Sequence, residues 1–183
     1  MMQKWHVRDT RLVYEHAPWL RIWEQDVTLP NGATIHGYIL TESRDVGMVL
    51  ALTPEQQVIL VEQYKHGIGD TEIDLPAGYL DPDDLSPLAG TQRELLEETG
   101  YGGGDWQPLG HFVTNPNRGQ DRFHFFLAQN VRPVTEPHLD PTEEINLHLV
   151  PLAQLRPWLA EHAPSLASMT GLLLGLEALG ASR

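Results

Sequence analysis

The segment "GYLDPDDLSPLAGTQRELLEETGY", residues 78–101, predicts a loop followed by a helix. Ser86 is a typical N-cap residue, and Pro87 suits the first helical position because the N–H that proline lacks would be unpaired there anyway. The helix is expected to run to about Thr99. Gly100 then fits the position just beyond the helix, where a left-handed backbone favours glycine.

The second half of this helix gathers carboxylates on one face. Glu94, Glu97 and Glu98 are spaced i, i+3 and i+4, so their side chains are neighbours. Like charges at this spacing cost roughly 0.2–0.5 kcal/mol per pair. A solvated helix face is one interpretation. The other is a site for a hard cation such as Mg²⁺ or Mn²⁺, which prefers oxygen ligands.

The whole segment resembles the Nudix box, whose pattern is Gly-x5-Glu-x7-Arg-Glu-U-x-Glu-Glu-x-Gly-U, with U a bulky apolar residue. "RELLEETGY", residues 93–101, matches the second half of the pattern, and Gly78 supplies the opening glycine after "LPA". One residue is inserted between Gly78 and Arg93. The loop glutamate of the pattern therefore falls on Asp84 counting forward, or on Leu85 counting back, and Asp83 or Asp84 is its only available replacement. The number of bound metals stays open.

The resemblance extends beyond the box. Over roughly residues 18–160, the sequence is similar to the ADP-ribose pyrophosphatase branch of the family. "LVEQYK" and "DLPAG" stand where that branch has "LVxQYR" and "ELPAG", with Lys65 replacing Arg and Asp74 replacing Glu. In that branch the N-terminal strands build a homodimer. The resemblance therefore implies an N-terminal β region for dimerisation over residues 1–45 and a Nudix hydrolase domain over 46–183. An additional sheet on a monomer is the alternative.

The remaining pattern agrees with an α/β (α+β) fold. Two β-rich arms flank "PNG" at residues 30–32, a hairpin signal. Further apolar strands are predicted in "VGMVLALT", "QVILVEQYKH", "IDLPAG", "QPLGHFVT", "RFHFFLAQNV" and "INLHLVP", and helices over about 152–162 and 166–180. The resemblance implies a Nudix-type α/β/α sandwich with a mixed sheet.

The resemblance also assigns roles within the site. Glu94, Glu97, Glu98 and the backbone carbonyl of Ala77 are the expected metal ligands, and Arg93 is expected to orient a box carboxylate. Water attacking a diphosphate also needs a base, which this branch carries on a late loop. Here that loop contains Glu143 and Glu144, and Glu144 is preferred because it adjoins the predicted strand.

Three residues outside the box are expected to meet substrate. Lys65 occupies the position of the family's arginine. Pro116 lies where ADP-ribose members carry a proline after the box, and Arg118 follows in the same loop. Surface roles are the alternative for Arg118 and its neighbour Arg122. His111 and His124 lie in predicted strands and are expected to be packed or hydrogen-bonded and not catalytic.

Composition limits the other possibilities. The net charge of −13 disfavours a nucleic-acid partner. The absence of cysteine excludes disulfides and a cysteine nucleophile, including the one used by isopentenyl diphosphate isomerases. No signal peptide or membrane span is predicted, so a cytoplasmic protein is expected.

The leading prediction is Mg²⁺- or Mn²⁺-dependent hydrolysis of ADP-ribose or a related nucleoside diphosphate sugar. NADH, dinucleoside polyphosphates, CoA derivatives or nucleoside triphosphates are alternative substrates, and a non-catalytic ligand sensor is the alternative to an enzyme.

Overall fold

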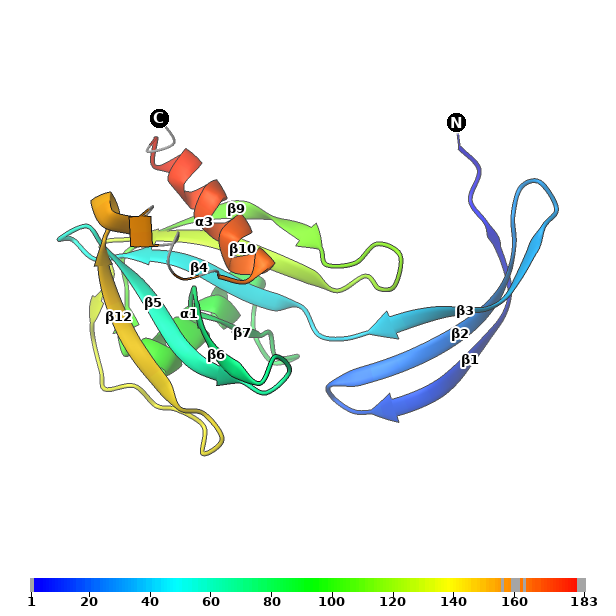
Figure 1. Cartoon of the computed structure of the whole chain (residues 1–183), viewed down its shortest axis with the longest axis horizontal. Helices are drawn as coiled ribbons and strands as arrows, with labels where there is room; N and C mark the ends of the chain where they lie inside the picture. Colours follow the sequence, from blue (N-terminus) through cyan, green and yellow to red (C-terminus); the bar gives the residue numbers. More distant parts are fainter. Residues whose placement is uncertain (1, 156, 159–161, 163, 181–183) are drawn as a thin grey trace. The chain divides into compact units, whose positions relative to one another are not determined.

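The computed structural model describes residues 2–155, 157–158, 162 and 164–180. The chain divides into two compact units. One combines Met1–Asp45 with Phe112–Arg122, and the other combines Val46–His111 with Phe123–Arg183. Figure 1 identifies the helices and strands.

The second unit is built on a seven-stranded mixed sheet. Its central order is β12-β5-β4-β10-β9, while β6 pairs with β5 and β7 pairs with β4. The strands are β4 (Val46–Leu52), β5 (Gln57–Lys65), β6 (Asp70–Asp74), β7 (Ala77–Tyr79), β9 (Asp105–Val113), β10 (Arg122–Gln129) and β12 (Ile145–Pro151). β10 runs parallel to β4, whereas β5 and β7 run antiparallel to it.

β7 lies where two central strands separate. β4 pairs with β5 only at Ala51 and Leu52, and its first three residues, 46–48, pair with β7 instead. The short strand β7 therefore continues the sheet beside the start of β4. This position brings the backbone of residues 77–79 next to the acidic helix.

One helix covers each face of this sheet. α1 (Pro87–Thr99) packs through Leu95 on a cluster that includes Val49, Ile59 and Phe126. α3 (Leu166–Ala178) covers the other face with Leu172 and Leu176, over a cluster from Met48, Leu50, Leu52, Val58, Leu60, Phe125 and Leu127. The predicted helix–sheet–helix arrangement is confirmed. The central strands β4, β5 and β10 supply buried apolar side chains to both faces.

The ends of α1 agree with the sequence prediction. The Ser86 hydroxyl accepts a hydrogen bond from the Ala89 N–H (3.1 Å), and Pro87 is the first helical residue. Gly100 closes the helix with φ of 73°, and its N–H donates to the Leu96 carbonyl. The helix expected over 152–162 falls partly outside the described residues. The structure shows a 3-10 turn, η1 (Leu152–Gln154), at its start.

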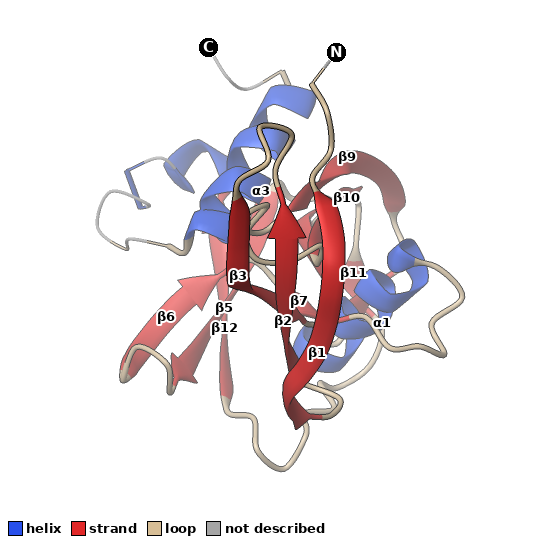
Figure 2. Cartoon of the chain, turned by 90° about the vertical axis from the view of Figure 1, so that its right-hand side faces the viewer, coloured by secondary structure: helices blue, strands red, loops and turns tan. Residues whose placement is uncertain are grey.

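The first unit contains a three-stranded antiparallel sheet in the order β1-β2-β3 (Figure 2). β2 (Leu20–Thr28) and β3 (Thr34–Glu42) form the hairpin predicted around residues 30–32. β1 (His6–His16) was not assigned from the sequence. It is an edge strand with all eleven residues exposed.

The loop between β9 and β10 belongs to this first unit. The Thr41 N–H donates to the Arg118 carbonyl (2.6 Å), and the Tyr38 hydroxyl donates to the Asn117 carbonyl (2.7 Å). Gly119 packs so closely on Thr41 that an added Cβ would lie 2.8 Å from the Thr41 carbonyl oxygen. Residues 112–122 are therefore attached to β3 by backbone contacts.

A two-stranded sheet of β8 (Tyr101–Gly102) and β11 (Arg132–Pro133) completes the second unit. Within the described ranges, no helix is both long and apolar enough to cross a bilayer.

Candidate active site

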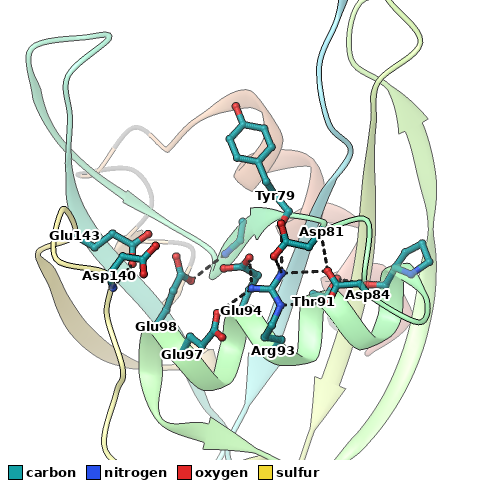
Figure 3. A network of polar contacts seen from close by, with 12 residues as sticks. Tyr79, Asp81, Asp84, Thr91, Arg93, Glu94, Glu97, Glu98, Asp140 and Glu143 are labelled. Atoms are coloured by element: carbon teal, nitrogen blue, oxygen red, sulfur yellow. Dashed lines mark hydrogen bonds and ion pairs between the residues drawn. The ribbon is translucent and has the colours of Figure 1, made fainter. Parts of the chain in front are cut away.

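The acidic face of α1 lies against β7. The Ala77 N–H donates a hydrogen bond to Glu98 Oε2 (3.1 Å), and the Glu98 residue is only 8% exposed. Glu94 is also largely buried, whereas the Glu97 side chain is 42% exposed. The three glutamates predicted from the sequence thus share one face, graded from the buried Glu98 to the open Glu97 (Figure 3).

Gly78 provides the space for Glu94. A Cβ built on Gly78 would lie 2.1 Å from the carboxyl carbon of Glu94 and 2.2 and 2.5 Å from its two oxygens. No side chain other than hydrogen can occupy this position while Glu94 keeps its place. The opening glycine of the motif is therefore explained by contact rather than by backbone conformation.

Arg93 connects the helix carboxylates to the preceding loop. Its Nη1 donates to Glu94 Oε1 (2.8 Å) and to Glu97 Oε2 (2.9 Å). Its Nε and Nη2 donate to the two oxygens of Asp84 (3.2 and 3.1 Å), and Nη2 also donates to the Tyr79 carbonyl (3.3 Å). Because a guanidinium has five N–H groups, these contacts use its full donor capacity. A lysine could not reproduce them.

The structure identifies which loop residue faces Arg93. The side chain of Asp84 is 13% exposed and bonded to Arg93, while Asp83 is exposed and Leu85 is 96% exposed. Of the three loop positions considered from the sequence, only Asp84 contacts the helix. In this chain the loop carboxylate pairs with an arginine, and it stands on the far side of that arginine from Glu97 (Figure 3).

Burial makes the negative charges of this site costly. It raises the pKa of Glu98 to about 8, and the nearby charge of Glu94 adds to the effect. Burial also raises the pKa of Glu94, against the opposing influence of Arg93. A divalent cation would offset this crowding, and an all-oxygen donor set is the type that Mg²⁺ and Mn²⁺ prefer. The chemistry of the residues therefore fits such a cation.

The carboxylates of Glu94, Glu97 and Glu98 do not converge on one point. No group of three or more His, Asp or Glu side chains in the described part of the chain is arranged to hold a metal ion. Glu94 and Glu97 instead both accept a hydrogen bond from Arg93 Nη1. Cation binding would require these two side chains to change partners.

The late acidic loop approaches the same face of α1. The charge of Glu143 acts on both Glu94 and Glu98, and Figure 3 shows Glu143 beside Glu98. A turn fixes this orientation: the Glu143 N–H donates to the Asp140 carbonyl (2.9 Å), and the Asp140 N–H donates to Glu143 Oε2 (3.1 Å). The structure thus places Glu143 close to the buried helix carboxylates, while the choice of base between Glu143 and Glu144 stays a prediction.

Sequence analysis missed Asp140, although "DPTE" carries a turn signal with Asp first and Pro second. Lys65 lies at the end of β5, and its charge acts on the buried Glu98. Its Nζ donates to Gln63 Oε1 (2.5 Å). Lys65 is therefore part of the same electrostatic environment as the helix carboxylates.

Pro116 and Arg118 belong to the other unit. They line a cavity of about 700 Å³ together with residues of β2 and β3, among them Trp23 and Glu42. Arg118 also donates from Nη1 to the Ile39 carbonyl (3.2 Å). Arg122 directs its side chain to the Gln120 carbonyl (3.2 Å). The rings of His111 and His124 lie on neighbouring strands with centroids 5.6 Å apart and 31° between their planes, and His111 is exposed while His124 is half-buried.

Comparison with known proteins identifies the family. A family model described as the NUDIX domain matches residues 42–170. The chain belongs to the Nudix family. The fold of the chain is also similar to that of a solved structure of an ADP compounds hydrolase, with a TM-score of 0.81, 21% identity, and coverage of 99% of this chain and 98% of that one.

Two bacterial relatives of this Nudix protein are more similar in sequence. It is 33% identical to an ADP-ribose pyrophosphatase of Bacillus subtilis over 132 residues, which cover 72% of this chain and 70% of the relative. It is 32% identical to a methanol dehydrogenase activator of Bacillus methanolicus over 112 residues, or 61% of this chain. The match spans 60% of the length of that activator.

Proposed function

We propose that this Nudix protein is a divalent-metal-dependent pyrophosphohydrolase. Its substrate is ADP-ribose or a related nucleoside diphosphate sugar, and Mg²⁺ is its usual cation. The observation that carries the proposal is geometric: Glu94, Glu97 and Glu98 share the face of α1 that lies against β7, where the Ala77 N–H holds Glu98 and Gly78 makes room for Glu94. The similarity to the ADP-ribose pyrophosphatase of Bacillus subtilis supports the substrate class.

The proposed ligands are the carboxylates of Glu94, Glu97 and Glu98, with the carbonyl of Ala77. A bound divalent cation neutralises diphosphate charge and polarises the P–O bonds. Within this group, Glu98 is held by the Ala77 N–H and Glu94 by its contact with Gly78. Glu97, being the most open, is the ligand best placed to meet solvent or substrate.

Glu143 is the proposed general base. Its Oε2 accepts a hydrogen bond from the Asp140 N–H, so Oε1 is the atom proposed to take a proton from the attacking water. A base on a separate loop avoids a conflict, since metal binding lowers the basicity of the helix carboxylates. Lys65 is proposed to contact a phosphate oxygen, and Pro116 and Arg118 to contact the nucleoside or sugar.

The N-terminal sheet is proposed to form a homodimer. β1 is a long exposed edge strand, and such an edge is a template for pairing. It carries exposed apolar side chains, Val7, Leu12, Val13 and Tyr14. A second copy of the chain would remove both features from solvent. The cytoplasmic location stays a prediction.

A substrate panel tests the activity. The full chain is incubated with ADP-ribose, GDP-mannose, NADH, a dinucleoside polyphosphate and ATP, with Mg²⁺, Mn²⁺ or a chelator. ADP-ribose is expected to give AMP and ribose 5-phosphate only with a cation. Faster cleavage of another compound would change the assigned substrate. No cleavage of any compound would favour a ligand sensor.

Activation of a methanol dehydrogenase is a second candidate, favoured by the relative from Bacillus methanolicus. It is tested by adding the chain to that dehydrogenase and measuring its turnover. An increase that requires Glu98 would link the effect to the proposed hydrolytic site.

A further inference from the structure

We propose that Asp84 is a positioning residue for the metal ligands, that it acts through Arg93, and that Leu85 is the extra residue of the lengthened loop. The inference rests on the proposed function, because it concerns the same cation site. It adds a role for the place where this chain departs from the family pattern. There, the chain has an aspartate and a loop that is one residue longer, where the pattern has a glutamate.

Asp84 is fixed from two directions. Arg93 donates to both of its oxygens, Nε to Oδ1 (3.2 Å) and Nη2 to Oδ2 (3.1 Å), in the paired geometry that makes Arg–carboxylate contacts strong. The Asp81 N–H donates to Oδ2 (2.7 Å), and the Asp84 N–H donates back to the Asp81 carbonyl (3.0 Å). Asp84 therefore joins its own loop to the helix.

A glycine on the helix makes room for this contact. A Cβ built on Gly90 would lie 2.5 Å from Asp84 Oδ2 and 2.7 Å from Leu80 Cδ2. Gly90 is a buried residue in the first turn of α1, and glycine has a low helix propensity. The space that the Asp84 carboxylate needs explains why position 90 is a glycine.

The position of the insertion follows from these contacts. Because Asp84 is the residue bonded to Arg93, the spacing from Gly78 to the loop carboxylate matches the family pattern. The extra residue must then lie between Asp84 and Arg93. Leu85 is 96% exposed and immediately precedes the helix cap Ser86. An aspartate is one methylene shorter than a glutamate, and the longer loop at Leu85 lets its carboxylate reach the same arginine.

The consequence for the cation site is electrostatic as well as geometric. Arg93 shares its charge between Asp84 on one side and Glu94 and Glu97 on the other. If the Asp84 charge is removed, the guanidinium keeps Glu94 and Glu97 and, on the loop side, only the longer contact of Nη2 with the more exposed carboxylate of Asp81 (3.5 Å) as an ion pair. It would then compete with an incoming cation more strongly and would no longer be held in one orientation.

The first experiment measures Mn²⁺ binding to the full metal-free chain without substrate, by electron paramagnetic resonance and calorimetry. Asp84→Asn is expected to weaken Mn²⁺ binding about 10–100-fold, as for other residues that orient metal ligands. Asp83→Asn is the matched control, since it removes the same charge from the neighbouring exposed position, and it should stay within about twofold of the wild type. Equal affinities for the wild type and Asp84→Asn would overturn the positioning role.

The second experiment tests whether the longer loop compensates for the shorter side chain of Asp84. Asp84→Glu alone and deletion of Leu85 alone should each weaken Mn²⁺ binding. The two changes together restore the family spacing and should recover affinity to within about threefold of the wild type. A combined variant no better than the single ones would overturn the assignment of Leu85.

Gly90→Ala keeps every charge and serves if Asp84→Asn does not fold. It should displace Asp84 and weaken Mn²⁺ binding, while circular dichroism shows an intact helix. Unchanged binding in Gly90→Ala would count against the proposal.

Hydrolysis measured on the same samples separates the two hypotheses. A wild type that binds Mn²⁺ but cleaves no nucleoside diphosphate refutes only the proposed function. One that binds no Mn²⁺ refutes both.

Discussion

Gly78→Ala is the most direct test of how closely β7 and α1 must approach. The backbone at Gly78 permits alanine, since its φ does not lie in the left-handed range. The added Cβ would nevertheless lie 2.1 Å from the Glu94 carboxyl carbon, whereas ordinary contact begins at 3.4 Å. Either the carboxyl group or the strand must therefore move by roughly 1 Å, which is enough to break the 2.8 Å bond from Arg93.

A displacement of about 1 Å in a group that positions substrate or metal can cost about 100-fold in rate. We therefore expect kcat/KM for ADP-ribose hydrolysis with Mg²⁺ to fall by about that factor. The fold should survive, because only one ligand side chain is pushed aside. The loss should appear with Mn²⁺ as well, since both cations would use the same carboxylates.

Gly67→Ala is the matched control. Gly67 lies in the turn between β5 and β6, and an added Cβ meets nothing within 4 Å. Its activity and thermal unfolding should match the wild type. The reasoning would be refuted if Gly78→Ala kept kcat/KM within about threefold of the wild type while its circular dichroism was unchanged.

Three further results are expected. Glu97→Gln and Glu98→Gln should each lower kcat by about 100-fold or more with the fold intact, because each variant loses a group that stabilises charge in the transition state. Near-normal rates in both variants would refute the proposed metal site. Glu143→Gln should lower kcat strongly with little change in KM or Mn²⁺ affinity, while Glu144→Gln should have the smaller effect; the reverse order would return the base to Glu144. Light scattering should give a mass near twice 20.6 kDa, and a monomer at working concentration would contradict the dimer.

The acidic helix could be predicted in detail because its signals are local. Ser86, Pro87 and Gly100 define its ends through contacts within a few residues, and the carboxylate spacing fixes the shared face. The pairing of Asp84 with Arg93 could not be predicted in the same way. It depends on the path of a loop with one extra residue, and counting along the chain leaves the partner ambiguous.

The position of Glu143 could not be predicted from the sequence for a related reason. Adjacency to β12 suggested that Glu144 is the better anchored, but the turn that begins at Asp140 directs Glu143 toward the helix carboxylates. β1 was missed because both of its faces are exposed, so Arg8, Asp9 and Arg11 interrupt any apolar alternation. Pairing between β1 and β2 is long-range and has no periodic signal of burial.

The attachment of residues 112–122 to β3 has a consequence for synthesis of the chain. Residues 1–45 leave the ribosome before the loop, and the backbone partners of Thr41 and Tyr38, at Arg118 and Asn117, emerge only some 70 residues after Asp45. At about 5–20 residues per second, this interval lasts on the order of ten seconds. Throughout it, Thr41 and Tyr38 lack their partners in the loop, and the apolar side chains of β1 are exposed. The N-terminal sheet is thus the segment that we expect nascent-chain chaperones to occupy, and the one whose mutations should lower yield before they alter catalysis.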